Sequence, residues 1–258
     1  MRKNIAGRAV GIFKEEGAKS FSKKALRRVA RCVAKRAIIF SLAPALLKIK
    51  HLDKNLTLNE LVGFAFNDFA RLIKPSQVRN EISELLRIVD GIKPKVILEI
   101  GTANGGTLFL FSHIAPEDAT MISVDLPGGR FGGGYSKWRD FLYKSFALPS
   151  QKLRLLRMDS HERRALEQVK GILGGRKLDF LFIDGDHTYK GVKRDFEMYS
   201  PLVREGGMIA FHDIVPGPAE NVGGVPQFWK EIKGQCNGKE IVENWDQGGY
   251  GIGLLSLK

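Results

Sequence analysis

Two short stretches of the sequence end apolar runs in side chains that can bind a metal or move a proton. FIDGDH occupies residues 182–187 and FHD occupies residues 211–213, and together they supply three aspartates and two histidines. Carboxylates that pack together repel one another, which raises some of their pKa values unless a cation lies between them. If the two stretches meet, a divalent metal is expected there. Carboxylates and water favour Mg²⁺ or Mn²⁺, whereas an imidazole ligand favours later transition metals.

The same residues also have structural explanations, which the sequence leaves open. Asp186 precedes the segment HTYKG and suits the N-cap position of a helix. His187 is expected to be either a general base or a structural residue, because a histidine at the start of a helix often only hydrogen-bonds backbone. His212 is expected either to reach the metal or to pack against the cleft without touching it. Asp184 and Asp213 are therefore the strongest functional candidates.

A second group of residues indicates a nucleoside site. The stretch ILEIGTANGG, residues 97–106, has the spacing E-x-G-x-x-x-G, which differs from the G-x-G-x-x-G fingerprint of dinucleotide sites. Its glycines allow a tight turn and a close approach to a ligand. Asp125 ends the next apolar run, where an acid can bind ribose hydroxyls. Asp159 ends the third, where a polar side chain can meet an adenine amino group. The three features together predict one nucleoside lying across a sheet.

The elements that must position these residues follow from the pattern after residue 95. Five apolar runs each precede an amphipathic segment: KVILEIG, TMISVDL, KLRLLRMD, LDFLFID and GMIAFHD. This alternation indicates a parallel sheet covered by helices on both faces. EIVENW, a Gly-rich turn DQGGYG and GIGLLSL then form a hairpin pattern. We therefore expect an α/β fold with a doubly wound seven-stranded sheet, in which the fourth and fifth strands are neighbours and FIDGDH meets FHD.

The residues before the sheet are expected to be helical. Two helical segments fill residues 54–90, separated by Pro75 and Ser76, and Ser76 is the expected N-cap of the second. The predicted organisation is therefore a basic arm over residues 1–50, a helical lead-in over residues 51–90, and the sheet domain over residues 91–258.

These motifs resemble the class I S-adenosylmethionine-dependent methyltransferases. LEIGTANGG is similar to their first motif, SVDL to their acidic second-strand end, and the terminal hairpin to their sixth and seventh strands. The resemblance covers roughly residues 90–258. It implies a Rossmann-like sheet of order 3-2-1-4-5-7-6 with strand 7 antiparallel. It also implies that the cofactor S-adenosylmethionine is bound by Glu99, Gly101, Thr102, Gly105, Asp125 and Asp159.

The fourth and fifth strand ends are similar to those of metal-dependent O-methyltransferases of the catechol and macrolide-sugar types. That resemblance implies Asp184, His212 and Asp213 as metal ligands and His187 as the base. His212 departs from the pattern, because those families usually have a carboxylate there. The stretch from FIDGDH to AFHDI resembles methyltransferase family 24, which does not fix a substrate.

The net charge of the chain is concentrated at its beginning. The formal charge is +13 over 258 residues, and residues 1–50 carry +12 of it. The two cysteines, Cys32 and Cys236, match no zinc spacing and no disulfide framework, which fits a reducing cytoplasm. The longest apolar run, residues 37–47, is too short to span a bilayer. We expect a cytoplasmic protein, with the basic arm as a route to a membrane surface.

Residues 21–40 have the periodicity of a basic amphipathic helix. Such a helix suits an anionic membrane surface. It equally suits docking on the main domain or on a second subunit, so a homo-oligomer is left open. Nucleic acid is the third choice, since no aromatic-plus-basic pattern of an RNA-binding module accompanies the helix.

Two loops are candidates for holding the acceptor. The Gly-rich residues 127–138 suit a lid, and Arg130 could meet an acidic acceptor, with a flexible connection as the alternative. Residues 215–229 could wall the acceptor pocket through Phe228 or Trp229, although Trp229 equally suits the core.

The predicted function is a metal-assisted O-methyltransferase. A metal that binds two vicinal oxygens lowers their pKa and orients them, and a nearby base then takes the proton. The acceptor is expected to be a small molecule or glycan: a hydroxyl of a saccharide, glycolipid or secondary metabolite. The alternatives are a metal-dependent phosphoester hydrolase and a non-catalytic module that binds S-adenosylmethionine or a membrane.

Overall fold

The computed structural model describes residues 42–44, 46–52, 56–68, 70–128, 134–234 and 237–257. The chain divides into two compact units, residues 1–51 and 52–258. In the first unit, residues 42–44 and 46–50 are helical. The predicted basic helix over residues 21–40 lies outside the described residues. No helix in the described part of the chain is long and apolar enough to cross a membrane.

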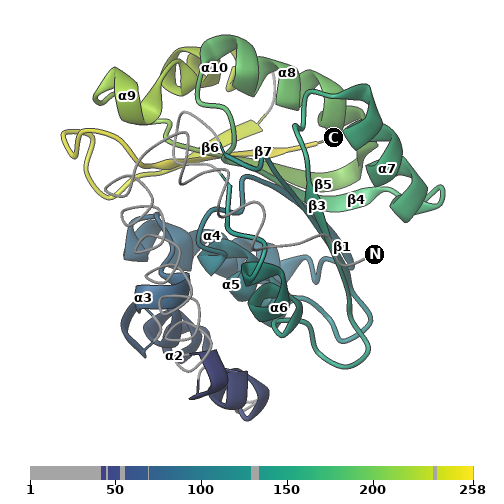
Figure 1. Ribbon diagram of the computed structural model, residues 1–258. Helices are drawn as coiled ribbons and strands as arrows, with labels where there is room; N and C mark the ends of the chain where they lie inside the picture. Colours follow the sequence, from purple (N-terminus) through teal and green to yellow (C-terminus); the bar gives the residue numbers. More distant parts are fainter. Residues whose placement is uncertain are drawn as a thin grey trace, which may run out of the picture. The chain divides into compact units, whose positions relative to one another are not determined.

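The second unit contains a seven-stranded sheet (Figure 1). Its strands are β1 Val96–Ile100, β2 Thr120–Asp125, β3 Lys152–Arg157, β4 Leu178–Ile183, β5 Val203–His212, β6 Asn237–Ile241 and β7 Ile252–Ser256. Their order is β3-β2-β1-β4-β5-β7-β6, with β7 antiparallel to both β5 and β6. The predicted α/β fold, strand order and antiparallel strand are thereby confirmed. Only the bounds shift: β5 begins earlier than GMIAFHD, and β6 ends near the start of EIVENW.

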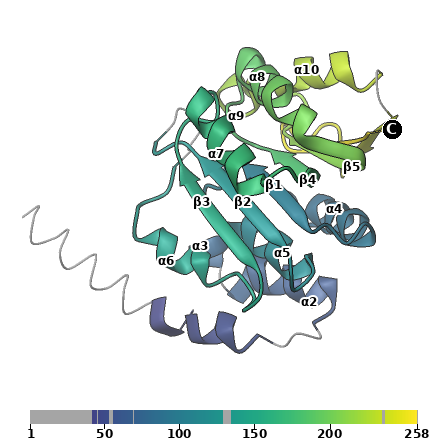
Figure 2. The ribbon, with the colours of Figure 1, turned by 90° about the vertical axis from the view of Figure 1, so that its right-hand side faces the viewer.

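The helices cover the two faces of the sheet. They are α2 Leu58–Gly63, α3 Ala70–Ile73, α4 Arg79–Gly91, α5 Gly106–Ile114, α6 Arg139–Lys144, α7 Arg163–Leu173, α8 Tyr189–Tyr199, α9 Ala219–Val222 and α10 Val225–Ile232. Figures 1 and 2 show α7, α8 and α10 on one face and α4, α5 and α6 on the other. Both layers are needed because every residue of β1 and β2 is buried.

Strand alternation divides the core between the faces. Leu98 and Ile100 of β1 join one buried cluster with Phe228 and Trp229 of α10. On the other face, Phe111 of α5 packs edge-on against strand β4, with ring centroids 5.2 Å from Phe180 and 5.3 Å from Phe182. Successive side chains point to opposite faces of a strand, so a strand buried on both faces packs against two helical layers.

Two details of the predicted lead-in are corrected. The first helical segment is interrupted, because a π-helix, Phe64–Asp68, lies between α2 and α3. The N-cap of α4 is Val78 and not Ser76, and Val78 makes no side-chain cap bond. Residues 76–77 form a bend that precedes the helix instead.

Candidate active site

A cleft of about 1260 Å³ lies at the carboxyl ends of the strands. The strand-end residues that line it include Gly101, Asp125, Asp159, Asp184 and Asp213. The fold thus brings both groups of motifs to one cavity, as the doubly wound order predicts. The cleft is also lined by parts of the chain outside the five motifs, at residues 74–78, 220–222 and 248–250.

The glycines of the first motif are required by close contacts. Gly101 has φ +89°, and a Cβ there would lie 1.9 Å from the carbonyl oxygen of Asp184. Glycine at this position therefore lets the end of β1 lie directly against the end of β4. Gly105 has φ +78° at the start of α5, and a Cβ there would lie 2.5 Å from the Tyr143 ring. Gly105 packs against Tyr143 and does not line the cleft.

Asp125 is held by the backbone. Its Oδ2 accepts from the N–H groups of Thr102, at 2.9 Å, and Ala103, at 2.8 Å, while Oδ1 accepts from Gly134 at 2.8 Å. Burial raises the pKa of the carboxyl, although the three backbone donors and Arg157 oppose the rise. Asp125 therefore ties the β1 loop to the loop after β2 at the place where ribose hydroxyls were predicted to bind.

Glu99 and Thr102 lie behind the cleft surface. Glu99 is fully buried and its Oε1 accepts from the Thr107 hydroxyl, while burial raises its pKa to about 8. The Thr102 hydroxyl bonds Ser123 on β2. Neither residue lines the cleft, so both are buried behind the loop that follows β1 and hold it in place. Their predicted contact with a cofactor stays a prediction.

Asp159 lies at the cleft beside a buried ion pair that the sequence did not suggest. Its Oδ1 accepts from the His161 N–H at 2.8 Å. The His161 ring points to α8, with Nε2 3.3 Å from Oδ1 of Asp195, which is fully buried. The adjacent Asp195 carboxylate raises the pKa of His161. His161 Nε2 also contacts the carbonyl of Gly191, which lies one turn before Asp195 on α8. The His161–Asp195 pair thus links the loop after β3 to α8.

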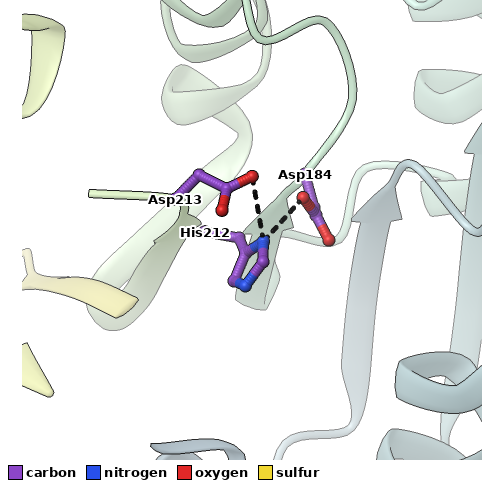
Figure 3. A group of neighbouring side chains, drawn as sticks. All are labelled: Asp184, His212 and Asp213. Atoms are coloured by element: carbon purple, nitrogen blue, oxygen red, sulfur yellow. Dashed lines mark hydrogen bonds and ion pairs between the residues drawn. The ribbon is translucent and has the colours of Figure 1, made fainter. Parts of the chain in front are cut away.

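Asp184, His212 and Asp213 meet at the ends of β4 and β5 (Figure 3). The Nδ1 atom of His212 lies 3.1 Å from Oδ1 of Asp184 and 3.4 Å from Oδ2 of Asp213. His212 therefore contacts both carboxylates. Burial opposes its charge, but Asp184 and Asp213 raise its pKa well above the usual value. Burial likewise opposes the charge of Asp184, whereas His212 and His187 lower its pKa.

The donor set of these three residues fits a divalent cation. One ligand atom from each lies within 4.8 Å of the others. An octahedral ion with bonds of about 2.1 Å places adjacent ligand atoms about 3 Å apart, close to the two distances from His212. One imidazole nitrogen and two carboxylate oxygens favour Mn²⁺ or a later transition metal over Mg²⁺. His187 and His212 contact the same carboxylates, so a cation has to compete with the two imidazoles.

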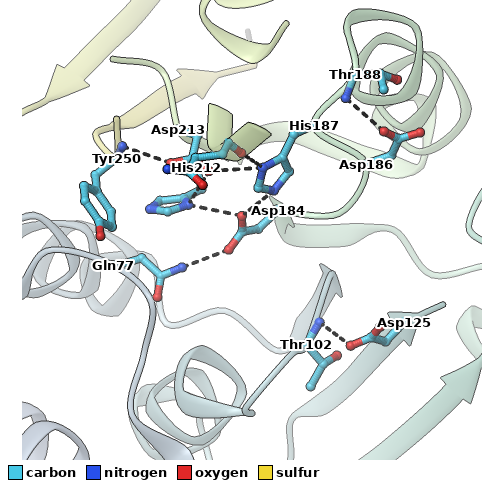
Figure 4. A network of polar contacts seen from close by, with 11 residues as sticks. Gln77, Thr102, Asp125, Asp184, Asp186, His187, Thr188, His212, Asp213 and Tyr250 are labelled. Atoms are coloured by element: carbon cyan, nitrogen blue, oxygen red, sulfur yellow. Dashed lines mark hydrogen bonds and ion pairs between the residues drawn. The ribbon is translucent and has the colours of Figure 1, made fainter. Parts of the chain in front are cut away.

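His187 lies against the same group (Figure 4). Its Nδ1 bonds the carbonyl of Asn221 and lies 3.3 Å from Oδ2 of Asp213, while Nε2 lies 3.4 Å from Oδ1 of Asp184. Burial opposes the charge, but the contact with Asp184 outweighs it and the pKa rises to about 9. The ring therefore hydrogen-bonds backbone, which is one of the two sequence expectations, and the acceptor is a residue of α9. The base role stays a prediction.

Gln77 is a site residue that the sequence analysis missed. Its Nε2 donates to Oδ2 of Asp184 at 2.8 Å (Figure 4). The pair is separated by 107 residues, and no local pattern marks it. The sequence analysis also did not predict that Asp213 and Tyr250 form a pair with strained backbone. They have φ +62° and +61°, and the Tyr250 N–H donates to Oδ1 of Asp213 at 2.9 Å. Left-handed residues other than glycine gather at functional sites.

Two further expectations are corrected. The N-cap of α8 is Thr188, whose hydroxyl accepts from the Gly191 N–H. Asp186 instead accepts from the Thr188 N–H at 2.9 Å, in the turn that precedes α8. Phe228 and Trp229 belong to the buried core and do not line the cleft. Arg130 lies outside the described residues.

Residues 98–214 match the Methyltransf_24 family, described as a methyltransferase domain. The tapetum-specific methyltransferase 1 of Arabidopsis thaliana is 30% identical over 132 residues, which are 50% of this chain and 50% of that protein. The chain spans half or less of the length of the curated relatives it matches.

Solved structures share the fold. The O-methyltransferase TomG of Streptomyces achromogenes, in complex with SAM, superposes with a TM-score of 0.51 and 17% identity over 81% of this chain and 93% of that one. An O-methyltransferase of Bacillus cereus, in complex with SAH, gives 0.51 and 19% over the same shares. Residues 98–214 are thus similar to a methyltransferase domain, and the chain shares the fold of these O-methyltransferase structures, which agrees with the resemblance seen in the sequence.

Proposed function

We propose that this protein is an S-adenosylmethionine-dependent O-methyltransferase assisted by a divalent metal ion. Its acceptor is a hydroxyl of a saccharide, glycolipid or secondary metabolite. The observation that carries the proposal is that Asp184, His212 and Asp213 converge in the same cleft as Gly101 and Asp125. A nucleoside cofactor and a cation-bound acceptor would thus be neighbours.

The residues divide the work between them. The Gly101 loop, Asp125 and Asp159 would hold S-adenosylmethionine, which supplies an electrophilic methyl group. Asp184, His212 and Asp213 would hold the cation, which lowers the pKa of an acceptor hydroxyl. These five side chains fix the two reactants beside each other, and such positioning converts a bimolecular displacement into an effectively unimolecular one.

The hydrogen bonds of His187 determine which of its nitrogens is the base. A carbonyl oxygen only accepts, so the Nδ1 atom bonded to Asn221 carries a proton. The atom that can take a proton is therefore Nε2, which faces Asp184. While Asp184 has no other counter-ion, it keeps the imidazole charged. The base role therefore requires Asp184 to be engaged by a cation, which links the two assignments.

Calorimetry of the full chain tests the proposal. We expect S-adenosylhomocysteine to bind and Mn²⁺ to bind at one site per chain. The His187→Ala variant should retain both while losing methyl transfer from labelled S-adenosylmethionine by about 100-fold or more. No binding of the cofactor would contradict the proposal. Full turnover in His187→Ala would remove the base assignment alone.

The basic arm gives a separate proposal, that residues 1–50 bring the enzyme to an anionic membrane. Its support is the charge of +12 in this segment. Replacing Lys23, Lys24, Arg27 and Arg28 by Glu should release the chain from phosphatidylserine vesicles and leave binding of S-adenosylhomocysteine unchanged. Unchanged sedimentation with vesicles would refute this proposal.

A further inference from the structure

Two buried polar atoms beside Asp184 have no partner among the described residues. They are Oε1 of Gln77 and Nε2 of His212. Both side chains are buried, with 6% and 4% of their surface exposed, and both line the cleft. Buried polar groups are nearly always hydrogen-bonded, so two unpaired atoms in one cleft indicate that a ligand completes them.

The chemistry of the two atoms is fixed by their neighbours. Gln77 donates through Nε2 to Asp184, so its Oε1 is an acceptor. His212 turns Nδ1 towards Asp184 and Asp213. When Nδ1 binds a cation, the proton of the neutral imidazole lies on Nε2, which is then a hydrogen-bond donor. A ligand hydroxyl both donates and accepts, and can satisfy either atom.

Tyr250 supplies an aromatic wall next to these atoms. Its ring lies 6.1 Å from that of His212, between centroids, and 43% of the residue is exposed. The bond from its N–H to Asp213 anchors it at the end of the β6–β7 hairpin. An exposed tyrosine ring beside hydrogen-bonding groups suits the face of a sugar ring, whose C–H groups are apolar and whose hydroxyls lie at the edge.

The charge of the cleft selects a neutral acceptor. The described lining contains six carboxylates and, apart from its histidines, a single cation, Lys74. The carboxylates are Asp125, Asp159, Asp184, Asp186, Asp213 and Glu220. The three histidines of the lining and the proposed cation offset part of this charge, so the cleft offers an acidic acceptor no excess of positive charge. A catechol would place both hydroxyls on the cation and leave Gln77 and His212 unpaired, which costs affinity.

We infer that Gln77, His212 and Tyr250 form a subsite for a neutral saccharide acceptor. Hydroxyls beyond the reacting pair bond Oε1 of Gln77 and Nε2 of His212, while the ring lies on Tyr250. Gln77 thus joins acceptor recognition to the positioning of Asp184. The inference rests on the proposed function and names the substrate class of the same site.

The test is binding to the full chain saturated with S-adenosylhomocysteine and Mn²⁺. The probes are the methyl pyranosides of glucose, galactose, mannose and rhamnose, with catechol and glucuronic acid as competitors of other chemistry. We expect at least one neutral glycoside to bind about tenfold or more tightly than catechol or glucuronic acid. Gln77→Met should weaken glycoside binding about tenfold. Tyr250→Ala, at an exposed loop position, should weaken it likewise and provides an independent variant.

A matched control is available in Gln151. This glutamine is also buried, but its Nε2 donates to the carbonyls of Ser112, Ala115 and Pro116, away from the cleft. Gln151→Met should lower stability and leave glycoside affinity per folded molecule unchanged.

The outcomes separate the two proposals. Failure of the wild-type chain to bind S-adenosylhomocysteine would overturn the proposed function. Three outcomes would overturn the saccharide subsite alone. The chain could bind S-adenosylhomocysteine and Mn²⁺ but none of the glycosides, or it could bind catechol or glucuronic acid more tightly than any glycoside. Glycoside affinity could also be unchanged in both Gln77→Met and Tyr250→Ala.

Discussion

The two ends of the cleft hold their carboxylates in different ways. At the β1–β3 end, Asp125 is bound by three backbone N–H groups. At the β4–β5 end, Asp184 is bound by the side chains of Gln77, His187 and His212. The first end is a backbone cradle suited to a polar, uncharged ligand. The second is an ionic cluster whose imidazoles can give up their protons, so a cation can replace them as counter-charge.

The difference predicts which substitutions separate the two ends. Side-chain partners can be removed one at a time, so changes at the β4–β5 end should affect metal binding with little effect on the fold. Backbone donors cannot rearrange without moving the loops, so changes at the β1–β3 end should affect stability and cofactor binding together.

The largest effect is expected for Asp184→Asn. Asp184 supplies one of the two carboxylate ligands, so its loss should lower Mn²⁺ affinity by about 100-fold or more, the upper end of what residues that only orient ligands cost. Binding of S-adenosylhomocysteine should change by less than about threefold. Asp186→Asn is the matched control, because Asp186 lies two residues away, outside the ligand group, and Asn retains the oxygen that accepts from Thr188. Equal loss of Mn²⁺ in both variants would show that the ligand group is assigned wrongly.

Asp125→Ala should have the next largest effect, at the other end. Three N–H groups lose their acceptor, and at about 1 kcal/mol or more for each the free energy of unfolding should fall by about 3 kcal/mol. Urea denaturation measures this. S-adenosylhomocysteine affinity should fall with it, whereas Mn²⁺ affinity at the β4–β5 end should be kept. A variant as stable as the wild type would disprove the cradle.

Gly105→Ala should be destabilising by about 2 kcal/mol, because the new Cβ is forced into a left-handed backbone and towards the Tyr143 ring. Thermal unfolding with S-adenosylhomocysteine and with Mn²⁺ should show that only the first ligand loses affinity. Gly171→Ala is the control: no atom lies within 4 Å of the added Cβ on α7. It should raise stability by about 0.5–1 kcal/mol. An unaffected Gly105→Ala would mean that the loop does not need this packing.

The smallest effect concerns pH and the loop after β3. The pKa of His161 is raised above the usual value of 6.5 by Asp195 and also by Asp159, while the backbone carbonyl of His161 accepts from Arg194. A raised pKa means that the stabilisation is complete below about pH 6.5 and is lost as pH rises through the folded value. Urea denaturation between pH 6 and 9 should therefore show a decline in the wild type that is smaller in His161→Gln. Identical profiles would show that the pair contributes nothing.

The sheet and the glycine turns could be predicted because their signals are local. Apolar runs of five or six residues, each followed by an amphipathic helix, leave few arrangements other than a covered parallel sheet. Asp125, Asp184 and Asp213 were identified because they directly follow such runs. The convergence of β4 and β5 at one rim also followed from the order of the strands.

The rest depended on contacts between distant segments. Gln77 reaches Asp184 from the loop before α4, and Asp195 reaches His161 from the buried face of α8. Nothing in the residues around Gln77 distinguishes it from an exposed glutamine before a helix. The left-handed backbone of Asp213 and Tyr250 was equally hidden: aspartate adopts positive φ more often than most residues, but only a few per cent of non-glycine residues do so, and tyrosine is not enriched there.

The most direct measurement of the central claim is anomalous scattering from crystals of the full chain grown with S-adenosylhomocysteine and Mn²⁺. The account predicts one manganese peak between Asp184, His212 and Asp213, with the cofactor at the β1–β3 end of the same cleft. A cofactor in place with no manganese peak at these residues, or a peak elsewhere, would contradict it.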